Sequence, residues 1–61
     1  MKITVTVGPM FARRDIDWPF PIPPRIGEQI ATDQDDDPPH FVKVVEWVPG
    51  QDEVLVVAEP R

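Results

Sequence analysis

Two stretches in the first half of the chain alternate apolar and polar residues, which is typical of half-buried β-strands. In Lys2–Val7, the residues Ile3, Val5 and Val7 fall on one face and polar residues fall on the other. In Asp15–Pro23, large apolar residues alternate with Asp and Pro, and the three prolines all lack their N–H groups along the same edge of an extended chain. We therefore predict a first strand at 2–7 and, at 15–23, an edge strand that cannot accept a further strand.

The stretch with the highest β-propensity is His40–Val48, but its hydrophobic pattern is mixed. Val42 and Val44 fall on one face of an extended chain, whereas Val45 and Trp47 fall on the other. Either this strand is buried on both faces, or a β-bulge near Val44 and Val45 resets its register. We favour burial on both faces, as expected for a central strand.

Turn residues divide the remaining chain. We expect residues 49–53 to form a hairpin loop that leads into a return strand at 54–59, antiparallel to the preceding strand. Gly27 is the expected position of positive φ in an earlier turn. Ile26 and Ile30, on either side of this turn, are expected to point inward.

Length and composition predict a single small domain spanning 1–61, with an acidic, proline-containing loop at 32–39. Nine residues are proline, and no proline-free segment has a 3.6-residue apolar period, so no long helix is expected. The chain has no Cys and only one His, which excludes disulfides and disfavours a structural zinc site. Packing or association must then stabilise the fold, and a homodimer is one expected state.

A known class of fold shares several of these features. Pro24–Glu28 reads Pro-Arg-Ile-Gly-Glu, and Val-rich segments follow at Phe41–Val45 and Val54–Val57. In this order, residues 22–59 resemble the small SH3-like barrels of bacterial and phage proteins. The resemblance implies a binding module rather than an enzyme, and it implies no site residues. The expected fold is all-β, as a small SH3-like barrel or a strongly bent antiparallel sheet of about five strands with a proline-blocked edge.

The net charge of the chain indicates which kinds of partner to expect. The net charge is −5, and residues 28–61 hold nine acidic residues against two basic ones. An acidic surface repels phosphates, so direct nucleic-acid binding is not expected and a protein partner with a basic surface is. No apolar run reaches the roughly 20 residues that a membrane span needs, and no signal-peptide pattern is present, so we expect a cytoplasmic protein.

The side chains that catalysis needs are scarce. Ser, Tyr, Asn and Cys are absent, which leaves Thr4, Thr6 and Thr32 as the hydroxyls. His40 has no evident nucleophile to activate. We therefore expect no catalytic residues, no cofactor and no enzymatic activity.

Acidic residues recur at alternate positions in the 32–39 loop. Asp33, Asp35 and Asp37 begin like a calcium-binding loop, but Pro38 and Val44 stand where that loop needs Gly and Glu, so no metal site is expected. In an extended backbone these carboxylates would be about 6.6–6.8 Å apart, similar to successive phosphates. The residues expected to bind a partner are Asp33, Asp35, Asp36, Asp37, Asp52 and Glu53.

Large aromatic residues form a second candidate surface. Trp18, Phe20 and Trp47 are expected in the core or at an oligomer interface. The leading hypothesis is an acidic protein that docks onto another protein, for example a phage or mobile-element inhibitor that mimics nucleic-acid charge, as DNA-mimicking anti-CRISPR proteins do. The alternatives are a homo-oligomeric accessory subunit with a merely solubilising loop, and a small-ligand-binding module.

Overall fold

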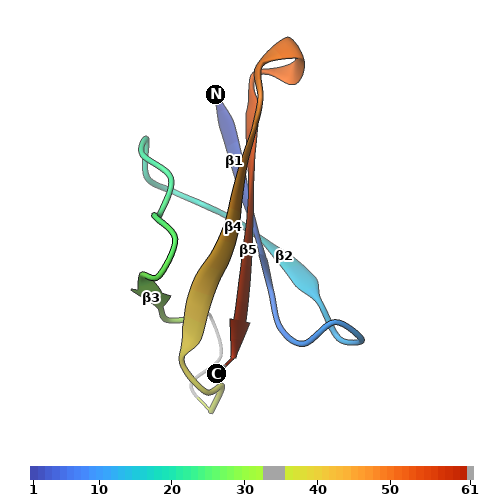
Figure 1. The fold of residues 1–61 in the computed structure, drawn as a ribbon, viewed down its shortest axis with the longest axis vertical. Helices are drawn as coiled ribbons and strands as arrows, with labels where there is room; N and C mark the ends of the chain where they lie inside the picture. Colours follow the sequence, from blue (N-terminus) through green and yellow to red (C-terminus); the bar gives the residue numbers. More distant parts are fainter. Residues whose placement is uncertain (33–35, 61) are drawn as a thin grey trace.

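All five strands belong to one curled sheet in the computed structural model, which describes residues 1–32 and 36–60 (Figure 1). The order across the sheet is β2-β1-β5-β4-β3. A 3-10 turn, η1, joins β4 to β5. The elements are β1 (Lys2–Val7), β2 (Arg14–Asp17), β3 (Gln29–Ile30), β4 (His40–Val48), η1 (Pro49–Gln51) and β5 (Glu53–Pro60). The all-β class with about five strands is therefore confirmed.

The centre of the sheet contains one parallel pair. β1 runs parallel to β5, with Val5 beside Val56, while β1 and β2, β3 and β4, and β4 and β5 pair antiparallel. The predicted β4–β5 hairpin is confirmed. The β1–β5 pair joins the first and last strands, so it departs from an entirely antiparallel sheet.

The core is small and aliphatic. Its buried residues share one face of the sheet and come mainly from β1 and β5: Ile3, Val5, Val7, Ile30, Val42, Val54, Val56 and Ala58. Val5 and Val56 are both 0% exposed. Ile16, Trp18 and Val45 pack against this cluster from its margin. The alternation predicted for 2–7 is confirmed residue by residue.

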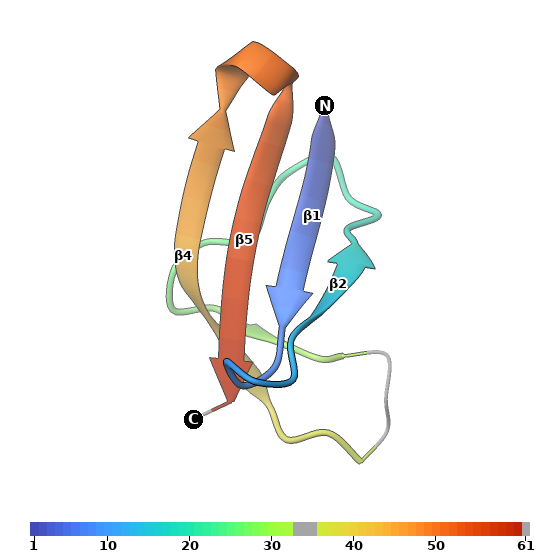
Figure 2. The same ribbon diagram turned by 90° about the vertical axis from the view of Figure 1, so that its right-hand side faces the viewer.

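One connection covers the core face. The segment Trp18–Glu28, here called the strap, leaves β2 and crosses behind the sheet toward β4 and β3 (Figure 2). We call the side that it crosses the strap face and the opposite side the open face. In Figure 1 the strap lies on the left of the edge-on sheet. Because no α-helix packs on the sheet in the described residues, the strap supplies the second layer.

The strand predicted at 15–23 is much shorter than expected. β2 lies at the edge of the sheet, as predicted, but it ends at Asp17, and the prolines follow in the strap. Proline cannot donate to a ladder, and here the chain leaves the sheet before the first of them. Phe20 and Ile22 are therefore 60% and 73% exposed and do not continue the buried face of Ile16.

A β-bulge in β4 explains the mixed hydrophobic pattern of His40–Val48. The register against β5 shifts between Val42 and Val44, so Val42 opposes Ala58 and Val44 opposes Val57. Val44 is 48% exposed and Trp47 is 59% exposed. Burial on both faces, which we favoured, is therefore wrong, and the alternative with a β-bulge is correct.

The turn at Gly27 forms as predicted. Gly27 has φ of 93°, a conformation that residues with a Cβ rarely adopt. Ile30 is buried, but Ile26 is 67% exposed, so only one of the two isoleucines points inward. Ile26 instead lines a groove at the surface, together with Trp47.

A candidate docking surface on the strap face

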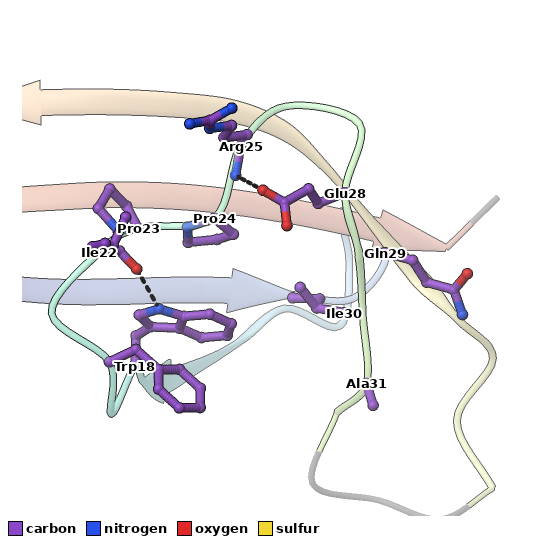
Figure 3. Close-up of a pocket in the computed structure, with 10 residues that line it drawn as sticks. Trp18, Ile22, Pro23, Pro24, Arg25, Glu28, Gln29, Ile30 and Ala31 are labelled. Atoms are coloured by element: carbon purple, nitrogen blue, oxygen red, sulfur yellow. Dashed lines mark hydrogen bonds between the residues drawn. The ribbon is translucent and has the colours of Figure 1, made fainter.

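Trp18 anchors the strap at its start. Its backbone N–H donates to the Ile3 carbonyl at 3.1 Å, which extends the β1–β2 ladder by one bond. Its indole Nε1–H donates to the Ile22 carbonyl at 2.9 Å, as Figure 3 shows. The Phe20 ring meets the indole edge-to-face, with centroids 5.3 Å apart and planes at 69°. These contacts close the Pro-rich segment into a compact loop around the indole.

Four backbone and side-chain bonds hold the end of the strap. The Arg25 N–H donates to Glu28 Oε1 at 2.8 Å, and the Glu28 N–H donates to the Arg25 carbonyl at 3.1 Å. The Gly27 N–H donates to the Val42 carbonyl at 2.9 Å, and the Val42 N–H donates to the Glu28 carbonyl at 3.0 Å. The turn is therefore tied to β4, and both ends of the strap are fixed to the sheet.

Between these anchors the strap face exposes a set of large apolar side chains. Phe20, Ile22, Ile26 and Trp47 are 60%, 73%, 67% and 59% exposed, and we call them the strap-face patch. Contiguous apolar surface on a small domain commonly marks an interaction site.

Two clefts flank the strap. One, of about 500 Å³, lies among Trp18, Pro24 and Ile30, and Figure 3 shows the indole beneath Pro24 at its wall. The other, of about 400 Å³, lies between Ile26 and Trp47. Both are shallow grooves, which suit side chains projecting from another surface.

Asp37 is turned into the protein. Its Oδ2 accepts hydrogen bonds from Thr32 Oγ1 at 2.6 Å and from Arg14 Nη2 at 2.5 Å. The Thr32 hydrogen bond, and after it the Arg14 hydrogen bond, hold the pKa of the Asp37 carboxyl below its ordinary value. Asp37 therefore ties the acidic loop to β2. Asp36 is exposed, and Asp33 and Asp35 lie outside the described residues.

The other two predicted partner-binding acids lie at the far end of the sheet. Asp52 closes the β4–β5 turn with φ of 51°, and Glu53 begins β5. The Met1 ammonium lies 3.3 Å from Asp52 Oδ2. β4 runs from the acidic loop at His40 to this turn (Figure 2), a span of about 26 Å. Of the predicted acids that the structure describes, Asp36 and Asp37 thus lie near one end of β4, and Asp52 and Glu53 lie near the other, so these four do not form one site.

Trp18, Phe20 and Trp47 are brought to the same face. Trp18 lines the margin of the core, whereas Phe20 and Trp47 are exposed and do not belong to the core of the single chain. An oligomer or partner interface stays a prediction for these two. Ile22 and Ile26 complete the patch, and sequence reasoning missed them. For Ile22, the signal was the run of prolines around it, which ends the strand that would have buried it.

The single histidine of the chain is hydrogen-bonded within the protein. His40 is 2% exposed, and its Nδ1–H donates to the Pro38 carbonyl at 2.8 Å. Within residues 1–32 and 36–60, no three His, Cys, Asp or Glu side chains gather as a metal site would require. The same residues contain no helix with the length and apolar character to cross a membrane.

The fold and the patch define a five-stranded β domain whose strap presents an apolar surface. Comparisons with models of protein families, with curated proteins and with solved structures found no match to the chain.

Proposed function

We propose that the protein is a non-enzymatic binding module that docks onto another protein through the strap-face patch. The observation that carries this proposal is the exposure of Phe20, Ile22, Ile26 and Trp47 on one anchored surface. Trp is among the residues most enriched at the energetic centres of interfaces. Because both ends of the strap are bonded to the sheet, binding would cost little ordering entropy.

The charge of the chain complements this docking surface. With a net charge of −5, the protein attracts partners that carry a basic surface and repels nucleic acids. Long-range attraction mainly raises the rate of association, whereas buried apolar contacts slow dissociation. The proposed partner is therefore a protein whose contact surface combines apolar side chains with Lys and Arg.

The patch is tested by capturing partners on immobilised protein from a lysate of the source cells. Ile26→Asp places a charge within the patch, beside the turn at Gly27, where the side chain is 67% exposed. Phe11→Asp is the matched control, because Phe11 is 92% exposed but belongs to the β1–β2 connection. We expect the captured partner to be lost with Ile26→Asp and retained with Phe11→Asp. Equal capture by the two variants would contradict the proposal.

A narrower version of this function is an inhibitor, of phage or mobile-element origin, that mimics nucleic-acid charge and blocks a nucleic-acid-binding surface. It is supported by the seven acidic residues between positions 33 and 53, of which Asp37 is bonded to Arg14. Its test is the double variant Asp35→Lys and Asp36→Lys, with Asp37 kept because it bonds Arg14. If the protein mimics nucleic-acid charge, the affinity for the partner should fall steeply in this variant. An unchanged affinity would contradict charge mimicry and would leave apolar docking as the remaining mode of binding.

A further inference from the structure

The outer edge of β4 is only partly paired. β3 pairs with His40 and Phe41, and the two bonds between Val42 and the turn extend this pairing by one residue. In the described part of the chain, no strand pairs with Lys43–Val48 on that side. Figure 2 shows this half of β4 with no neighbouring strand on its outer side. This part of β4 is thus a sheet edge to which another chain can add.

The register identifies which backbone groups point outward. The Gly8 N–H donates to the Ala58 carbonyl, so Ala58 and every second residue before it in β5 turn their backbone groups toward β1. Val45 and Trp47 lie opposite two of those residues, and so direct their own N–H and C=O groups away from β5. The same alternation predicts that Val42 points outward, and its two bonds to the turn confirm it.

The two edges of the sheet differ. β2 is four residues long, carries the exposed carboxylates of Asp15 and Asp17, and is followed closely by Pro19. Short length, charge and proline all prevent a further strand from adding to an edge. The free part of β4 is longer and has no proline before Pro49. Of these two edges in the described residues, the free part of β4 is therefore the one better suited to pair with a further strand.

Pairing with a second copy of the chain is disfavoured at this edge. The antiparallel register that joins Val45 of one copy to Trp47 of the other would use every outward backbone group of these residues. That register also places Glu46 opposite the Glu46 of the other copy, and like charges directly opposite are destabilising. A dimer with its two-fold axis at Val45 avoids this contact. It pairs fewer outward N–H and C=O groups, because the bulge between Val42 and Val44 interrupts the alternation of outward and inward residues along β4.

We propose that the β4 edge, Lys43–Val48, is a strand-addition site for an extended segment of another protein in which apolar and basic residues alternate. This inference rests on the proposed function and names its mode of binding. The apolar residues of the segment lie on the strap face, over the cleft between Ile26 and Trp47. A Lys or Arg of the segment faces Glu46 on the open face. Glu46 thus rejects a second copy and selects a basic strand.

The probe is a fluorescein-labelled heptapeptide that alternates Val and Lys, titrated with the protein and followed by fluorescence anisotropy. We expect saturable binding that weakens about tenfold with Glu46→Lys, since an attractive cross-strand pair becomes repulsive. Asp17→Lys on β2 changes the net charge equally and is the matched control. An equal loss in both variants, or no binding of the peptide, would overturn the proposal.

Two further measurements test the backbone pairing. In an extended peptide, alternate N–H groups point to opposite edges, so two peptides can be made, each N-methylated along one edge. N-methylation should abolish binding in only one of them, because only one edge of the peptide faces β4. Val45→Pro removes an outward N–H without removing a bond to β5, so it should abolish peptide binding while the protein stays folded. Binding that tolerates both methylated peptides would exclude strand addition.

A separate experiment tests whether Glu46 prevents pairing with a second copy of the chain. Glu46→Val removes the like-charge contact, and sedimentation velocity should then show dimers where the unsubstituted protein shows monomers. A dimer of the unsubstituted protein would contradict this role.

If Ile26→Asp abolishes partner capture while Glu46→Lys leaves peptide binding unchanged, strand addition fails and docking through the patch stands. If the peptide binds as expected but Ile26→Asp captures the partner normally, the edge site stands and the patch does not.

Discussion

Substitution of Trp47 should weaken binding of a partner more than it destabilises the fold. The side chain projects from β4 on the strap face and is 59% exposed in the single chain. Trp47→Ala therefore removes some contacts within the fold and a larger area that a partner can cover. Its neighbours on the strand, Glu46 and Val48, keep their pairing to β5.

The magnitudes follow from this exposure. A Trp residue offers about 200 Å² of largely apolar surface, of which about 80 Å² is buried in the fold and about 120 Å² stays available to a partner. At about 25 cal/mol per Å², the substitution costs at most about 2 kcal/mol of folding free energy and about 3 kcal/mol of binding free energy. The second value corresponds to a Kd increase of about 150-fold. The variant should stay folded, since a chain of this size has about 3–9 kcal/mol of stability.

The assay is titration calorimetry with the captured partner, alongside urea unfolding of each variant. Phe11→Ala is the matched control, because Phe11 is 92% exposed and lies outside the patch. We expect an unchanged Kd for Phe11→Ala and an increase of about two orders of magnitude for Trp47→Ala. A Kd for Trp47→Ala within about threefold of the original would refute docking through the patch.

Three further predictions concern the fold. Val56→Ala deletes two methyl groups from a fully buried position, so urea unfolding should show a loss of about 2–3 kcal/mol with little change in slope. Hydrogen bonds from Thr32 and Arg14 lower the pKa of Asp37, so its carboxylate stabilises the fold above about pH 4, and this contribution disappears as the pH falls through the lowered pKa. Asp37→Asn should therefore flatten the acid side of a melting-temperature profile, and an unchanged profile would show that the contact contributes nothing. Gly8→Ala should cost about 1–3 kcal/mol in the same urea assay, because Gly8 has φ of 112° and a Cβ would lie 2.8 Å from a backbone oxygen; a smaller loss would mean that the connection relaxes easily.

Local patterns predicted the strands whose pairing is local or whose alternation is complete. Lys2–Val7 and His40–Val48 have the predicted bounds, because β-branched residues and flanking turn residues mark both. The parallel pairing of β1 with β5 could not be predicted in the same way. It joins residues about fifty positions apart, and no local residue pattern specifies a partner at that distance.

The candidate site was predicted in part. Trp18, Phe20 and Trp47 were singled out as large aromatic residues, but the exposure of Ile22 and Ile26 depends on where β2 ends. Alternation alone cannot tell an extended strap from a strand, since both have a two-residue period. The acidic residues were treated as one surface, and only the three-dimensional structure shows Asp37 bonded to Arg14 and the turn acids at the opposite end.

The parallel contact between β1 and β5 has a consequence for biosynthesis. While the chain is being translated, β1 emerges from the ribosome first, but its inner partner is the last strand to be made. The central ladder, and with it most of the hydrophobic core, can close only after translation of β5. Folding is then dominated by contacts of high sequence separation, which slow it and leave the apolar face of β1 exposed until β5 is available.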